Sequence, residues 1–270
     1  MPKLSALSDT LYVPLLGRIY TSKNHPAVLY DEAALSLWDQ LPKAVQEMPF
    51  QTEYTQLASA VRSMNMDHYI KAFLVKYPKG SIVNLGCGLE SLYERNDNGQ
   101  AQWFELDLPE VLAERKRFFP PQERDHTLPY SMFEDQWIEE VMKISTQPVF
   151  IAAAGLFIYF QEEQVIEVIE RLSRFKQAQL VFDTVSALGI KISRSYVKKM
   201  GKQEATMYFS VDNPKALMNR LSNAVKSIES QRYYRLVPRH STIKLATRLK
   251  MAFSDLFNMV KMINIQIENV

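Results

Sequence analysis

Two glycines followed by two acids are the residues of this sequence best placed to bind a ligand. Gly86 and Gly88 come directly after the apolar run 81–85, and glycines there let the backbone turn sharply beside a nucleotide-like ligand. Glu105 and Asp107 lie 19 and 21 residues beyond Gly86, a spacing at which an acid can accept both hydroxyls of an adenosine ribose. Ser91 stands where the dinucleotide fingerprint has a third small residue, so the local pattern does not choose between cofactors.

Alternating strands and helices must position these residues. Short apolar runs separated by amphipathic stretches and glycine or proline turns predict repeated β-α units and a parallel sheet. The predicted strands are 81–85, 102–108 and 127–132, with further strands in the apolar runs 147–160 and 177–186, and the predicted helices are 89–96, 110–118 and 162–175. Residues 4–73 form a helical pattern interrupted by prolines, ending in a helix that contains Arg62.

The C-terminal part of the chain contains a polar stretch with short predicted elements, followed by one more predicted helix and one more predicted strand. The stretch after Ser186 contains a predicted helix at 214–221 and a strand at about 225–233. A helix from about 241 to 260 has many apolar side chains, which favour a core or dimer face, while Lys250 and Lys261 leave an interfacial role open. Alternating isoleucines and polar residues at 263–268 predict a half-exposed terminal strand.

Composition and charge exclude several classes of function. The chain has 270 residues with 47% hydrophobic and 23% charged residues, as in globular proteins. A net charge of +2 disfavours a nucleic-acid binder, and one cysteine excludes a disulfide framework. The four histidines lie too far apart for a ligand pair, so no metal is expected. No apolar run reaches the ~20 residues that span a bilayer, so we expect a cytoplasmic protein without stable membrane insertion.

Several segments resemble the leucine carboxyl methyltransferase family, and most closely its bacterial branch of tetracenomycin-type polyketide O-methyltransferases. The resemblance runs from about residue 10 to 190. It is carried by LYVPLLGRIYTS, by Arg62, by VNLGCGLESLYERNDNGQAQWFELDLPEVLAERK, and by the later segments AAGLFIYF and LVFDTVS.

The resemblance implies an α/β fold of the Rossmann-like class I methyltransferase type that binds S-adenosylmethionine. Its sheet would have seven strands, mostly parallel, with an antiparallel C-terminal strand. Residues 1–79 would form an N-terminal helical cap, and residues 80–270 the core with a variable insert at about 186–240. A small-molecule acceptor is implied, and a homodimer is possible.

The resemblance also implies roles for particular residues. Arg62 would pair with the methionine carboxylate of the cofactor, with Arg18 a second candidate, and Asp107 would bind the ribose. The remaining positions are the glycine loop (Gly86 and Gly88), the adenine-facing Ser131 and Met132, Ala154 near the cofactor's amino group, and Tyr159 on the acceptor side as the candidate catalytic residue. The family usually has glutamate where this chain has Ala154.

We therefore expect an O-methyltransferase that acts on a carboxylate or hydroxyl oxygen of a small acceptor, for which aromatic or polyketide-like compounds are candidates. A carboxylate is already ionised at neutral pH and needs no general base, whereas a hydroxyl acceptor would need one, for which His126, Asp183 or Tyr159 are candidates. Two alternatives remain at this stage. One is a methyltransferase-like binding or scaffold protein without turnover, suggested by Ala154, and the other is an NAD-dependent oxidoreductase.

Overall fold

A single seven-stranded sheet organises the chain. The structure, a computed structural model, describes residues 4–48, 52–145, 148–191 and 207–269, and of residues 4–10 it describes only the course of the helix. The strand order is β3-β2-β1-β4-β5-β7-β6. The strands are β1 (Ser81–Leu85), β2 (Gln102–Leu106), β3 (Asp125–Leu128), β4 (Val149–Ala153), β5 (Gln177–Val185), β6 (Val225–Arg232) and β7 (Val260–Glu268).

Strands β1 to β5 pair in parallel, and β7 runs antiparallel between β5 and β6. The predicted fold class, a mostly parallel sheet with an antiparallel C-terminal strand, is therefore confirmed. Because β1 and β4 are central and parallel, the carboxyl ends of both face the same edge of the sheet, where ligands bind in open α/β folds.

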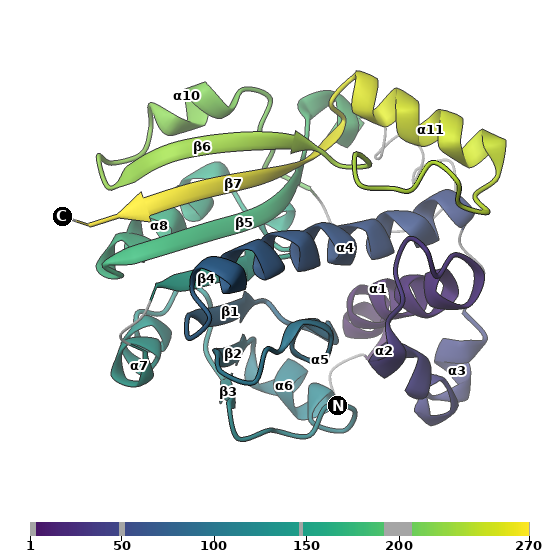
Figure 1. Ribbon diagram of the computed structural model, residues 1–270, viewed down its shortest axis with the longest axis horizontal. Coiled ribbons are helices and arrows are strands. Elements are labelled where there is room, and N and C mark those ends of the chain that lie inside the picture. The colour runs from purple at the N-terminus through teal and green to yellow at the C-terminus, as the bar shows by residue number, and fades with distance from the viewer. Residues whose placement is uncertain (1–3, 49–51, 146–147, 192–206, 270) are drawn as a thin grey trace.

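Helices cover both faces of the sheet (Figure 1). Successive side chains of a strand point to opposite faces, so Val83 packs into the core formed with α7 and α8, and Ile82 into the core formed with α4. The α-helices are α1 (Leu4–Asn24), α2 (Glu32–Ser36), α3 (Lys43–Gln46), α4 (Glu53–Lys76), α5 (Leu92–Asn96), α6 (Pro109–Arg115), α7 (Gln136–Ile144), α8 (Glu162–Arg171), α10 (Pro214–Met218) and α11 (Leu245–Leu256). Three 3-10 turns lie at Trp38–Gln40, Phe157–Tyr159 (η2) and Leu172–Arg174.

The N-terminal helices pack in two ways. Helices α1 to α3 share a separate apolar cluster that includes Leu15, Ile19 and Leu37 and reaches Leu89 beside the glycine loop. Helix α4 instead packs on the sheet, where Val61 and Ile70 belong to the same core as Ile82. The boundary at residue 79 between cap and core stays a prediction, and part of the predicted insert at 186–240 lies outside the described residues.

Two expected elements are shifted. The third strand lies at 125–128 and not at 127–132, so Ser131 and Met132 follow it in a turn. The last helix ends at Leu256, four residues before the expected end, because the chain reverses there: Asn258 has φ +48° and the Met259 N–H donates to the carbonyl of Ser254 at 2.9 Å. This αL residue and its 6→1 hydrogen bond are those of a Schellman cap.

The apolar face of that last helix points away from the core. Leu245, Leu249 and Phe253 of α11 are exposed, whereas its buried residues are Thr247, Met251 and Ser254. The interpretation of this face as core is therefore wrong. Among the described residues no helix is long and apolar enough to cross a membrane.

Candidate functional site

A cavity of about 300 Å³ opens at the carboxyl ends of the central strands. Its walls come from α1, α4, the loop after β1, the end of β2 and the segment after β4. The sequence-predicted residues on its lining are Arg18, Arg62, Gly86, Gly88, Asp107, Ala154 and Tyr159. The topology thus brings together, in one cavity, residues that are far apart in the sequence.

The glycine loop begins where β1 ends. Gly86 has φ +67° and Gly88 φ +48°, a region of backbone conformation that favours glycine. The N–H groups of Gly86 and Cys87 both donate to the carbonyl of Leu106, at 2.8 and 3.1 Å. A Cβ on Gly86 would lie 2.8 Å from Leu156 Cδ1, so a larger residue would strain the backbone and also require the Leu156 side chain to move.

Asp107 follows β2 and holds the same loop in place. Its Oδ2 accepts a hydrogen bond from the Gly88 N–H and its Oδ1 one from the Leu108 N–H, both at 2.8 Å. Burial raises the pKa of this carboxyl, and the two backbone N–H groups oppose that rise by stabilising the anion. Asp107 therefore presents a fixed acceptor at the cavity wall, as recognition of a ribose requires.

Arg62 of α4 reaches the cavity beside the end of β5. Its Nε donates to Asp183 Oδ2 at 3.0 Å, and Asp183 Oδ1 accepts from the Gly155 N–H at 2.6 Å. The guanidinium lies where a Cβ on Gly155 would stand, and Gly155 has φ +65°, so only glycine fits. Burial by itself would lower the pKa of Arg62. The negative charge of Asp183, its hydrogen bond and the nearby Tyr233 and Tyr159 together raise it by more, so the side chain stays cationic.

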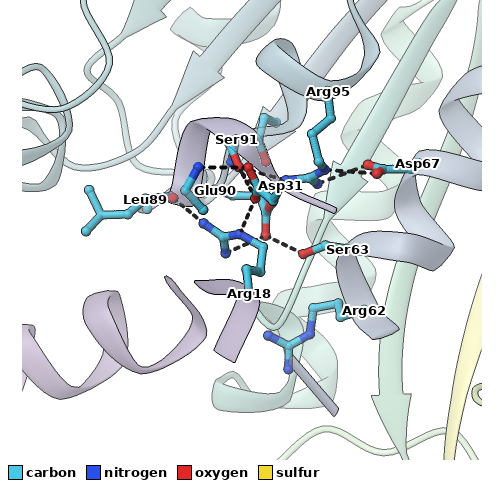
Figure 2. A network of polar contacts seen from close by, with 12 residues as sticks. Arg18, Asp31, Arg62, Ser63, Asp67, Leu89, Glu90, Ser91 and Arg95 are labelled. Carbon is cyan, nitrogen blue, oxygen red and sulfur yellow. Dashed lines mark hydrogen bonds and ion pairs between the residues drawn. The ribbon is translucent and has the colours of Figure 1, made fainter. Parts of the chain in front are cut away.

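Arg18 of α1 also lines the cavity, but its guanidinium is bound on several sides. Nε donates to Asp31 at 3.0 Å, Nη1 to Glu90 at 3.0 Å and Nη2 to the carbonyl of Leu89 at 2.6 Å. Figure 2 shows Arg18 inside a network of ion pairs and Arg62 outside it. Arg18 therefore fastens α1 to the loop after β1.

The network around Arg18 includes a second buried arginine. Arg95 of α5 binds Asp31 at 2.9 Å, Asp67 at 2.9 Å and Glu90 at 2.8 Å (Figure 2). Burial by itself would raise the pKa of Glu90, and the charges of Arg18 and Arg95 lower it to about 2. The network joins α1, α2, α4 and α5 around the glycine loop, so it stabilises the shape of the site.

Behind the loop lies a second buried group of charges. The Asn84 amide donates to Glu105 Oε2 at 2.7 Å, and Arg115 lies 3.2 Å from Glu105 Oε1. Burial raises the pKa of Glu105 despite this arginine. Burial also raises the pKa of the Cys87 thiol well above its usual range, which disfavours the thiolate needed for nucleophilic attack.

The remaining predicted residues lie in different surroundings. Tyr159, at the end of η2, is 36% exposed on the cavity wall, and Ala154 lies on the same wall. Ser131 is half-buried in the turn after β3 and Met132 is buried in the core, and neither lines the cavity. His126 of β3 binds the Gln102 side chain at 2.9 Å and stacks on Phe104, also away from the cavity.

Within the described residues no group of three or more histidine, cysteine or acidic side chains is arranged to hold a metal ion. Sequence reasoning missed Glu90 and Leu156 at the cavity, and it named Asp183 only as a possible base. In the sequence, Asp183 can be recognised as a site residue because it follows the apolar run LVF near the end of a predicted strand. Residues near the carboxyl end of a parallel strand lie at the same edge of the sheet as the glycine loop.

The chain matches a known protein family. Residues 13–173 match the family described as leucine carboxyl methyltransferase. The tetracenomycin polyketide synthesis O-methyltransferase TcmP of Streptomyces glaucescens is 24% identical over 221 residues, which cover 81% of this chain and 80% of that protein. The matched range 13–173 contains Arg62, the glycine loop and Asp107.

Solved structures support the fold. The plantazolicin methyltransferase BamL, in complex with a triazolic desmethylPZN analogue and SAH, superposes with a TM-score of 0.52 at 11% identity, covering 98% of this chain and 100% of that one. A protein of the DUF574 family from Streptomyces avermitilis superposes with a TM-score of 0.55 at 12% identity, covering 93% and 96%. At such identities these likenesses show a shared fold.

Proposed function

Because the chain belongs to the leucine carboxyl methyltransferase family, we propose that it transfers a methyl group from S-adenosylmethionine to a carboxylate or hydroxyl oxygen of a small acceptor. The chain is a methyltransferase, and family membership leaves the oxidoreductase alternative without support. One cavity brings together the glycine loop, the fixed carboxylate of Asp107 and the cationic Arg62, and this convergence is the main support for the proposed site.

The residues present fit the cofactor. A Cβ on Gly88 would meet only Leu11, at 3.4 Å, so the loop leaves a cradle that a side chain would begin to fill. Asp107 would bind the ribose hydroxyls beside this cradle. The terminal nitrogens of Arg62 pair with no carboxylate in the described part of the chain, so they would bind the carboxylate of the methionine part.

Asp183 supplies a carboxylate at the place where Ala154 lacks one. Strand β4 ends at Ala153, which pairs with Phe182 of β5, and the Gly155 N–H donates to Asp183 at 2.6 Å. Ala154, between Ala153 and Gly155, therefore lies close to Asp183. We infer that Asp183 both orients Arg62 and gives this wall the negative charge that favours the cofactor's ammonium group. The loss of glutamate at Ala154 then weakens cofactor binding without abolishing it.

S-adenosylmethionine supplies a methyl group activated by the sulfonium charge. The chain's own residues hold the two reactants, and such positioning can contribute ~7–11 kcal/mol to lowering a barrier. A carboxylate acceptor arrives ionised and needs no base. Tyr159 lines the same wall as Gly155 and Leu156, and we propose that its hydroxyl donates a hydrogen bond to the acceptor oxygen and so orients it.

A methyl-transfer assay tests the proposal and identifies the acceptor oxygen. The protein is incubated with methyl-labelled S-adenosylmethionine and panels of aromatic carboxylic acids and phenols. A labelled product that mild base hydrolyses is a methyl ester from a carboxylate, whereas a stable product is an ether from a hydroxyl. Asp107→Asn should lower turnover through a raised cofactor KM, and Glu110→Gln, an exposed acid three residues later, should leave it unchanged.

The alternative of a binding or scaffold protein without turnover rests on Ala154. The same assay, together with a cofactor-binding measurement, distinguishes it from an enzyme. Tight binding of S-adenosylhomocysteine with no labelled product from any acceptor would support it. A labelled product from any panel would exclude it, because turnover requires both reactants in one site.

A further inference from the structure

Helix α11 carries a continuous apolar stripe on its outer side. Leu245, Leu249, Phe253 and Leu256 recur at the spacing that places residues on one helix face, and their exposed fractions are 73%, 62%, 51% and 68%. Phe257 follows at 49% and lies against the Phe253 ring, with centroids 4.5 Å apart. Single exposed apolar residues are common, whereas a contiguous patch marks an interaction surface.

Folding does not account for this stripe. The inner side of α11 holds the helix in place with Met251, which belongs to the core shared with α4, with the buried Ser254, and with Thr247, whose hydroxyl donates to Glu53. In Figure 1, α11 lies at the periphery of the molecule, beyond α4. The side chains of the stripe are therefore available to something outside the described residues.

The sequence around the stripe is strongly basic. Residues 232–254 contain no aspartate or glutamate and six cations, which are Arg232, Arg235, Arg239, Lys244, Arg248 and Lys250. In the described part of the chain none of these six has a carboxylate within ion-pair distance. At 3.6 residues per turn, Arg248 and Lys250 flank the apolar stripe on its two sides.

We propose that α11 docks the protein on the surface of an anionic lipid bilayer, lying in the plane of the interface. The apolar stripe would enter the boundary between headgroups and acyl chains, and the flanking cations would meet the lipid phosphates, as in interfacial amphipathic helices. Long basic side chains suit this position because their stems cover apolar surface while their charges stay in water.

Charge favours this occupant over a second copy of the chain. A symmetric dimer through α11 would bring the same basic stretch against itself. The one acid of the helix, Asp255, is half-buried and accepts a hydrogen bond from the Tyr234 N–H, so the facing cations would repel each other and disfavour a dimer. The stripe is a convex ridge on the outside of a helix. A deformable, negatively charged bilayer matches such a ridge without needing a complementary groove.

Vesicle co-sedimentation tests the proposal. The full chain is mixed with vesicles of phosphatidylcholine alone and of equal parts phosphatidylcholine and phosphatidylglycerol. The protein should bind the anionic vesicles, bind the neutral ones at least about tenfold more weakly, and lose affinity as salt rises.

Two pairs of variants connect binding to α11. Leu249→Ser with Phe253→Ser should weaken partitioning by roughly tenfold or more, since two inserted apolar side chains are lost. Val75→Ser, at an 84% exposed position on α4, is the matched control and should bind as the wild type. The double variant Lys244→Gln, Lys250→Gln should weaken binding to anionic vesicles and leave binding to neutral vesicles unchanged. Lys79→Gln is its matched control and should bind as the wild type.

Circular dichroism and the thermal midpoint show whether each variant is folded. Absence of binding to both vesicle types overturns the proposal, as does binding that the α11 variants leave unchanged. A concentration-dependent dimer that Phe253→Ser disperses, without vesicle binding, would overturn it in favour of self-association.

Discussion

Arg18 and Arg62 line the same cavity, but their different surroundings give them different roles. Arg18 is 1% exposed and binds two carboxylates, so its charge is used within the protein. Arg62 is 22% exposed and pairs with one carboxylate, that of Asp183. The sequence favoured Arg62 over Arg18 as the ligand of the methionine carboxylate, and the geometry supports that preference.

Replacement of Arg62 tests this difference directly. Arg62→Ala should weaken binding of S-adenosylhomocysteine roughly 10- to 100-fold, because a charge-assisted hydrogen bond of about 1.5–3 kcal/mol is lost. Isothermal titration calorimetry measures the change. Arg117→Ala removes an arginine that is 59% exposed and should bind with wild-type affinity. An unchanged affinity in Arg62→Ala would show that this side chain is not the carboxylate ligand.

Asp183 is expected to act in part through Arg62. Asp183→Asn keeps an oxygen for the Gly155 N–H but removes the charge that orients the guanidinium. Cofactor affinity should fall by about tenfold. In the double variant with Arg62→Ala, the Asp183 change should lower affinity by less than it does alone, because only its effect on the ammonium group remains. Additive losses in this double-mutant cycle would contradict the pairing.

Local sequence patterns predicted the site residues that directly follow a strand. They missed the residues whose place in the site depends on contacts between distant segments of the chain. The glycines and Asp107 belong to one β-α-β unit, so their spacing in the sequence carries their geometry. Glu90 follows the same loop, but its partners Arg18 and Ser63 come from two helices far away in the sequence. No pattern in the sequence indicates which helix surfaces will meet there.

At the scale of elements, the buried ion-pair network makes the stability of the helical layer depend on pH. Glu90 has its pKa lowered to about 2 in the folded protein, from 4.5. Its contribution is therefore fully present above about pH 4.5 and is lost as the pH falls toward 2. The contribution amounts to roughly 3 kcal/mol.

Chemical denaturation of wild type and Glu90→Gln at a series of pH values measures this contribution. The difference in unfolding free energy should be largest near pH 6 and should shrink by roughly 3 kcal/mol toward pH 2. Glu123→Gln, at an exposed acid, should follow the wild type at every pH. A difference that does not vary with pH would show that Glu90 is not stabilised as an anion.

The end of α11 offers a test of backbone conformation. Asn258 occupies the left-handed region at φ +48°. Asn258→Gly should be neutral or slightly stabilising, whereas Asn258→Ala should lower the unfolding free energy by about 1 kcal/mol. Thermal or urea unfolding of the two variants distinguishes them. Equal stability of both would mean that the left-handed conformation is not maintained in solution.

Element positions were predictable where apolar runs are long and less so where they are short. The runs of β1, β4 and β5 are buried on both faces, so their strands appear clearly in the sequence. Strand β3 has only four residues, one of them exposed, and its predicted position was shifted. The pattern of α11 revealed an apolar face but not its direction, because periodicity alone does not say which face meets the core.

At the scale of the whole molecule, the sheet order and the cavity follow from the same topology. The β-α alternation predicted parallel strands, and the family resemblance implied the antiparallel direction of the terminal strand, which pairs with β5. The placement of α1 across the glycine loop depends on the buried pairs of Arg18, which join segments tens of residues apart. That arrangement could be seen only in the folded chain.

The most direct test of the account is a titration of the wild-type protein with S-adenosylhomocysteine and, in parallel, with NAD, followed by thermal unfolding. A ligand at 100 times its dissociation constant should add about 2.7 kcal/mol of stability. A site for S-adenosylmethionine predicts stabilisation by S-adenosylhomocysteine, none by NAD, and a much smaller effect in Arg62→Ala. Stabilisation by NAD alone, or by neither ligand, would contradict it.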